Sequence, residues 1–149
     1  MLAVFTILIV GSASAFDLSS LFGDSSSNGS SQEITIEGNN FSIPDDYAKN
    51  PKSFLDNVTT NTGTVSYTMN GQTFENDKGE AIAIVVTDYN GMNVTEQALK
   101  AAGDTKKTIN GHDGYIKKDG EFSVFSYIEN GDLVTISLSD ENLLGQIIA

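Results

Sequence analysis

The sequence contains no cysteine, and this absence removes several kinds of chemistry at once. Disulfides, thiolate nucleophiles and zinc–thiolate sites all need cysteine side chains. A lipid-modified cysteine after an N-terminal leader is excluded for the same reason. The chain also lacks arginine, so no guanidinium group is present to recognise phosphate through two parallel hydrogen bonds.

Positive charge is scarce as well. Twenty acidic residues oppose eight lysines, which gives a formal net charge of -12 at pH 7. A field of this sign repels nucleic acid and anionic lipid, so we expect no nucleic-acid partner. Solubility is the preferred explanation for the acidic charge, ahead of attraction for a cation or a basic partner.

A single histidine, His112, is the only imidazole available for acid–base catalysis. It follows the turn dipeptide Asn110-Gly111, and its neighbour Asp113 would point to the opposite face of a strand. No G-x-S-x-G elbow, P-loop or dinucleotide-binding G-x-G-x-x-G motif accompanies it. We therefore expect no enzymatic activity, and a hydrolase that uses His112 is kept only as the third functional alternative.

Acidic residues gather in several expected turns, but their spacing does not match a calcium-binding loop. Turns favour aspartate and asparagine for backbone reasons alone. We therefore expect no metal site and no cofactor. The acidic turn clusters are Asp45-Asp46, Asn76-Asp77 with Glu80, Asp88 with Asn90, and Asp132.

The N-terminus has the pattern of an exported protein. Residues 1–15 read MLAVFTILIVGSASA, an apolar run followed by small residues, which predicts a secretory signal peptide. An uncleaved membrane anchor is the second interpretation, and a buried helix is the third. Residues 16–32 are rich in serine and glycine and predict a flexible tether, so one domain would span residues 33–149. We expect a secreted or extracytoplasmic protein, with no stable membrane insertion after leader cleavage.

Residues 106–140 carry the strongest structural signal. Short β-forming runs in this stretch are separated by dipeptides that readily adopt the positive φ angles of tight hairpin turns. The whole domain is predicted to be α+β, with an antiparallel sheet of about seven to eight strands built from hairpins and flanked by two or three short helices. The turn dipeptides are Asn110-Gly111, Asp119-Gly120 and Asn130-Gly131.

The hairpin around Asn130-Gly131 can be predicted residue by residue. A two-residue turn pairs Phe125 with Ile136 and Tyr127 with Val134. These four side chains share one face, which we expect to be core. The opposite face is expected to be wet and carries Val124, Ser126, Thr135 and Ser137.

Other regions give weaker predictions. The pattern predicts a strand over residues 33–37, a turn over residues 38–40, and a second hairpin turn at Asn70-Gly71. Residues 47–61 are ambiguous, with Asn50 as the N-cap of one or two helical turns. Residues 80–87 are apolar on both faces, which is typical of a strand in the middle of a sheet under a helix.

Two helices are expected in the second half of the domain. Asn93 begins a capping box and Gly103 stops the helix, whose small alanines should let it lie close against the sheet. Ser139 is expected to cap the last helix. The apolar face of this last helix should close the core with Leu143, Leu144, Ile147 and Ile148.

Three runs of the sequence carry a family resemblance: ITIEGNNFSIP, FENDKGEAIAIVV and TINGHDGYI. With the closing strand pair and helix, they resemble small secreted proteins of uncharacterised function from methanogenic archaea. The run FSIPDDY also resembles the opening of the photosystem extrinsic-protein (oxygen-evolving P protein-like) fold, an antiparallel sheet flanked by helices. The resemblances imply export and a fold, and they imply no activity.

The leading functional hypothesis is a non-catalytic interaction module with an unidentified protein or cell-envelope partner. The alternative is a sensor or carrier of a small ligand or cation, bound between the sheet and the helix over residues 93–103. Its candidate pocket residues are Tyr89, Tyr115 and His112. Asn28 and Asn57 begin N-x-Ser/Thr triplets and are the candidate N-glycosylation sites.

Overall fold

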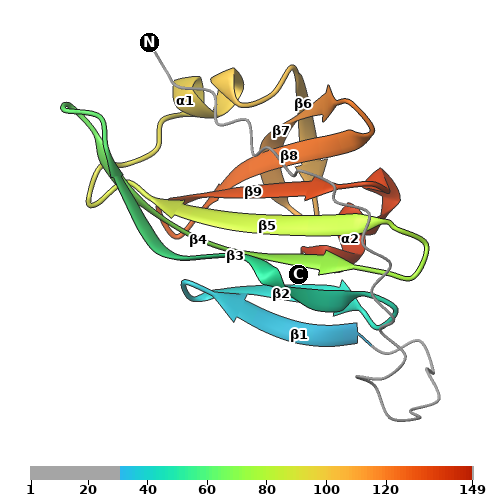
Figure 1. Cartoon of the computed structure of the whole chain (residues 1–149). Coiled ribbons are helices and arrows are strands. Elements are labelled where there is room, and N and C mark those ends of the chain that lie inside the picture. The colour runs from blue at the N-terminus through green and yellow to red at the C-terminus, as the bar shows by residue number, and fades with distance from the viewer. Residues whose placement is uncertain (1–30, 149) are drawn as a thin grey trace.

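The computed structural model describes residues 31–148, which form a mainly β domain with few and short helical segments (Figure 1). The predicted leader, Asn28 and the predicted tether up to residue 30 lie outside the described residues. The first strand begins at Ser31, just before the predicted domain start at residue 33.

The described residues contain nine strands in two sheets. Seven strands form one antiparallel sheet in the order β3-β4-β5-β9-β8-β7-β6, and β1 and β2 form a separate hairpin. The prediction of seven to eight strands in one sheet is therefore correct for the main sheet but did not separate the first hairpin from it. The strands are β1 (Ser31–Ile36), β2 (Asn39–Pro44), β3 (Ala48–Asn61), β4 (Ser66–Glu75), β5 (Ala81–Asp88), β6 (Thr105–Ile109), β7 (His112–Asp119), β8 (Phe122–Glu129) and β9 (Asp132–Leu138).

The β8–β9 hairpin has the predicted register. Phe125 pairs with Ile136 and Tyr127 with Val134, and the turn residues Asn130 and Gly131 have φ angles of 53° and 87°. This pairing places the apolar side chains on one face of the sheet, where all four are buried. β5 lies beside β9 in the interior of the sheet, as its apolar pattern predicts.

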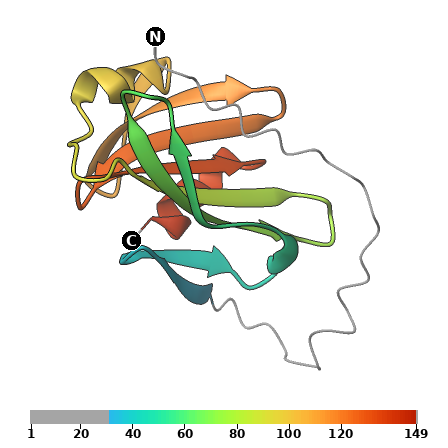
Figure 2. The ribbon, with the colours of Figure 1, turned by 60° about the vertical axis from the view of Figure 1, so that its left-hand side comes forward.

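The core lies between this face of the sheet and a layer made by the β1–β2 hairpin and the C-terminal helical segment. Figure 1 shows the hairpin below the sheet, with α2 (Leu144–Ile147) beside it, and Figure 2 shows the same layer from another side. Phe41 of β2 forms an isolated bridge with Ile148, which joins the two parts of the layer. Five side chains of this layer are fully buried: Phe41, Ile43, Leu144, Ile147 and Ile148.

The C-terminal helix differs from the prediction at its start. Asp140, and not Ser139, caps a short 3-10 turn, η2 (Glu141–Leu143), by accepting a hydrogen bond from the Asn142 amide. The Ser139 hydroxyl instead accepts a hydrogen bond from the amide of Ala81 at 3.0 Å. Ser139 therefore fastens the end of β9 to the start of β5.

The predicted hairpin turn at Asn70-Gly71 is wrong, because β4 runs straight through these residues. Gly71 has no room for a side chain, since a Cβ there would lie 2.8 Å from the carbonyl oxygen of Ile84 on β5. The chain turns earlier, where the Thr62 amide donates to the Val65 carbonyl. Glycine is present here for a close approach of two strands and not for a turn.

The predicted helical turns within residues 47–61 are also wrong, because β3 occupies this region and pairs with β4. Thr59 and Thr60 favour the extended conformation, and pairing with β4 outweighs the local helix signal at Asn50. The register shifts twice along β3, and Asn57 has a φ of 49° at the second shift. The first turn also moves, to Glu37-Gly38, because Ile36 pairs with Asn39.

Candidate functional site

The second face of the main sheet is lined by short side chains along its centre. Val85 of β5 pairs with Thr135 of β9, which pairs in turn with Ser126 of β8. The prediction that this face is wet is not correct for these strands, because Ser126 is 1% exposed and Ser137 is 6% exposed. Another part of the chain must therefore cover them.

The cover is α1 (Glu96–Ala101) with the loop that leads into it from β5. The hydroxyl of Thr95, and not the side chain of Asn93, caps the helix by accepting from the Ala98 amide at 3.1 Å. Figures 1 and 2 show α1 over β7 and β8, while the far end of the β3–β4 hairpin bends toward the helix from the other side. The helix and this hairpin therefore enclose the face from both sides.

Gly103 sets the height of α1 above the sheet. A Cβ at this position would lie 2.8 Å from the main-chain carbon and from the Cβ of Tyr115 on β7. Directly after it, the Asp104 amide donates to the carbonyl of Ile116 at 3.0 Å. The predicted close packing of helix against sheet is thus found at this C-terminal end, next to the predicted helix stop.

A cavity of about 530 Å³ separates the rest of α1 from the sheet. It exists because both walls use small side chains: Ala98, Ala101 and Ala102 from the helix meet hydroxyl residues and valines from the strands. Side chains this short cannot meet across the gap between the two layers. The lining is mostly apolar and includes Leu55, Val65, Met69, Val85, Met92, Val94, Val124 and Leu133.

The polar groups of the cavity are few and have distinct positions. Ser126 and Thr135 form a hydrogen bond with each other at 3.3 Å on the sheet floor. Within residues 31–148, the charged side chains of the lining are Lys117 and Asp119, both from β7. An apolar cavity with a small number of placed polar groups is the usual form of a small-molecule site.

Tyr89 stands at the end of the cavity opposite β7. Its ring packs against that of Tyr67, with centroids 5.7 Å apart. Burial, with a smaller contribution from Tyr67, raises the pKa of the Tyr89 hydroxyl above its ordinary value. The hydroxyl is therefore neutral at physiological pH, where it serves as both a donor and an acceptor of hydrogen bonds.

The structure does not bring the three predicted pocket residues together. Tyr89 lines the cavity, whereas Tyr115 is buried beneath Gly103 on the same face of the sheet and is not part of the lining. His112 lies on the core side of the sheet, where its ring is 5.0 Å from that of Tyr127. Its Nδ1 atom is 2.9 Å from a carboxylate oxygen of Glu129.

Several lining residues were missed by the sequence reasoning, Lys117 and Met92 among them. The sequence signal for these residues was the presence of small side chains on both the helix and the strands. Short side chains occupy alternate positions along β8 and β9, and the helix above them is rich in alanine. We interpreted the alanines as a sign of close packing. Short side chains on both layers produce a cavity instead.

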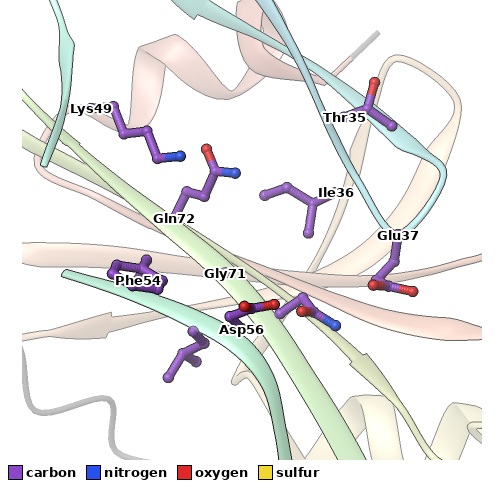
Figure 3. Close-up of a pocket in the computed structure, with 10 residues that line it drawn as sticks. Thr35, Ile36, Glu37, Lys49, Phe54, Asp56, Gly71 and Gln72 are labelled. Atoms are coloured by element: carbon purple, nitrogen blue, oxygen red, sulfur yellow. The ribbon is translucent and has the colours of Figure 1, made fainter. Parts of the chain in front are cut away.

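A second, more polar groove of about 340 Å³ lies between the tip of the β1–β2 hairpin and strands β3 and β4. Figure 3 shows Ile36 facing the side chains of Lys49 and Gln72 across it, with Phe54 on the β3 side. Phe54 is 57% exposed, which is high for an aromatic side chain. This groove is a candidate contact surface and not a closed pocket.

Carboxylates do approach one another at the edge of the domain. Burial, then the charges of Asp88 and Glu37, raise the pKa of Asp132 above its ordinary value. Nevertheless, no group of three or more histidine or acidic side chains within residues 31–148 is arranged to hold a metal ion. No helix in this same part of the chain has the length and apolar character needed to cross a membrane.

Asn57, the candidate glycosylation site that the structure describes, lies exposed on β3. Its amide nitrogen Nδ2 donates to the carboxylate of Asp56 at 3.0 Å.

Comparison with protein-family models, curated proteins and solved structures finds no match to this chain. Any functional assignment therefore depends on the geometry of the cavity and the groove.

Proposed function

We propose that this domain binds a small, mainly apolar ligand in the cavity beneath α1 and does not transform it. The observation that supports the proposal is the cavity itself: about 530 Å³ lined by apolar side chains from five strands, two loops and a helix. Sites for small molecules typically have volumes of about 300–1,000 Å³ and linings of this kind. Of the functions considered from the sequence, the ligand sensor or carrier is thus preferred over the interaction module.

The chemistry of the lining supports binding without catalysis. Ser126 of β8 and Thr135 of β9 form a hydrogen bond with each other, and the lining contains no histidine. Activation of a hydroxyl nucleophile needs a base within hydrogen-bonding distance. The arrangement around Ser126 and Thr135 supplies a polar floor and no such pair.

The predicted leader and tether extend this proposal to the location of the protein. A signal peptide over residues 1–15 and a serine-rich tether over residues 16–32 would deliver the domain to the outside of the membrane. The acidic charge of -12 suits a soluble extracytoplasmic domain. The proposed protein is therefore a secreted or surface-held ligand-binding module.

Thermal unfolding of the full chain with neutral apolar probes, such as decanol, tests the proposal. A ligand at a hundred times its dissociation constant stabilises a protein by about 2.7 kcal/mol, which raises the melting temperature by several degrees. Ala98→Phe, which fills the cavity from the helix, should abolish the rise. An equal rise in the wild type and in Ala98→Phe would place the probe elsewhere and contradict the proposal.

The second candidate function is contact with a protein or cell-envelope partner through the groove in Figure 3, and the exposure of Phe54 favours it. Aromatic side chains, phenylalanine included, are enriched in protein–protein interfaces relative to the rest of the surface. Recovery of an envelope partner by the wild type but not by Phe54→Ser would support this function. Equal recovery by both would exclude the groove.

A further inference from the structure

The ligand class can be narrowed by the charged groups of the cavity, on the assumption that the proposed binding function is correct. Lys117 belongs to the lining of the cavity, and the residue is partly buried. Within residues 31–148, no carboxylate lies within 4.0 Å of it. Desolvation of a cation without a partner costs free energy.

The next lysine in the chain, Lys118, forms an ion pair with a carboxylate. Lys118 is on the core side of the sheet, where its Nζ atom is 3.1 Å from Glu141. Lys107 pairs with the same carboxylate. Lys117, by contrast, lines the cavity and forms no such ion pair within residues 31–148.

The position of Lys117 gives the cavity a direction. β7 lies near one edge of the main sheet, whereas β3 and β4, which carry Leu55 and Met69, lie at the other edge. The lining between these ends is mostly apolar. A ligand would therefore place a negative group near Lys117 and an apolar body along the sheet toward the β3–β4 hairpin.

We infer that the cavity binds an amphiphile with an apolar body and a single carboxylate, and that Lys117 pairs with this carboxylate. Asp119 also lines the cavity but is exposed, so water screens its repulsion of the carboxylate. The remaining acidic residues act over longer distances and are screened at physiological salt, where the Debye length is about 8 Å. The local cation thus decides the preference against the net charge of the chain.

Titration calorimetry with decanoate, decanol and decyltrimethylammonium tests the inference, because these probes share one apolar chain and differ in charge. The full chain should bind decanoate about tenfold more tightly than decanol, as expected for a hydrogen bond to a charged group. Lys117→Met, which keeps the length of the side chain, should remove that tenfold advantage, so that this variant binds decanoate no more tightly than decanol.

Lys106→Met is the matched control. Lys106 is exposed on the neighbouring strand, pairs with Tyr115 and is outside the cavity lining, so its loss removes the same charge without changing the site. It should keep the preference for decanoate. If both lysine variants lost the preference for decanoate equally, the preference would be an effect of net charge, and the inference would be overturned.

The outcomes also separate this inference from the proposed function. Decanoate and decanol bound equally by the wild type, or decyltrimethylammonium bound most tightly, would overturn the role of Lys117 while the apolar cavity site stands. A failure of all three probes to bind, or binding that Ala98→Phe does not weaken, would contradict the proposed function itself.

Discussion

Replacement of Gly103 by alanine tests whether the height of α1 above the sheet controls both stability and the cavity. The added Cβ would lie 2.8 Å from the main-chain carbon of Tyr115 and 2.9 Å from the nitrogen of Ile116. Both neighbours are backbone atoms of β7, which is held by β6 and β8 and cannot move aside independently. The segment that carries α1 must move instead.

Overpacking of this kind costs about 1–3 kcal/mol, and we expect Gly103→Ala to lower the free energy of unfolding by an amount in that range. Movement of the segment would lengthen the bond from the Asp104 amide to the Ile116 carbonyl. It would also widen the cavity, so apolar probes should bind the variant more weakly. Urea unfolding and titration with decanol measure the two effects on one sample.

Gly145→Ala is the control for the same chemical change. Gly145 is in α2, and a Cβ there would have no atom within 4 Å. Alanine in place of glycine inside a helix stabilises by roughly 0.5–1 kcal/mol, so this variant should gain slightly or stay unchanged. If Gly103→Ala proves as stable as Gly145→Ala and binds decanol like the wild type, the reasoning about α1 is wrong.

Three further predictions concern the core and the charged groups. Phe125→Ala should destabilise by about 3–5 kcal/mol in urea unfolding, because this side chain is 0% exposed at the centre of the core; a loss below about 1 kcal/mol would mean that the core is not packed around it. Hydrogen bonds from Lys107 and Lys118 lower the pKa of Glu141, so the contribution of Glu141 to stability is present above the unfolded pKa and is lost as the pH falls through the folded pKa. Glu141→Gln should therefore lower the free energy of unfolding by about 0.5–1 kcal/mol at neutral pH. A difference from the wild type that persists in strong acid would contradict the ion-pair origin. Burial, followed by the charge of Glu80, raises the pKa of Tyr47 to about 12. The stability that Tyr47 contributes is therefore complete below the unfolded pKa of tyrosine and is lost as the pH rises through the folded pKa. Tyr47→Phe should flatten the fall in stability above about pH 10, and an unchanged alkaline profile would assign that fall to other groups.

The part of the fold that could be predicted is the part where turn chemistry and side-chain alternation agree. At Asn130-Gly131 both signals support one register, and the structure has that register. At Asn70-Gly71 the turn dipeptide is the same, but the residues on both sides continue a strand that pairs with two neighbours. Local sequence does not distinguish a glycine needed for positive φ from one needed because a backbone approaches it closely.

The cavity lies where the sequence patterns place a helix over a strand, but most of its lining residues could not be predicted. The helix over residues 93–103 and the strand beneath it were both visible as patterns, and a ligand between them was one of the alternatives. Of the three candidate pocket residues, Tyr89 is the one that lines the cavity. Whether Lys117 lines the cavity depends on the face of β7 that it occupies and on the distance of α1 from the sheet. These are tertiary properties that no short motif encodes.

The cavity face indicates that stability alone did not determine the choice of residues in this domain. The core face of β8 and β9 carries Phe125, Tyr127 and Ile136, whereas the cavity face of the same strands carries Ser126, Thr135 and Ser137. Burial of apolar surface contributes about 25 cal/mol per Å², so valine or leucine at these three positions, packed against a larger helix face, would stabilise the fold further. Hydroxyls opposite alanines give up that stabilisation and keep a space open. In the proposed function, this space between the small residues of both walls is where the ligand binds.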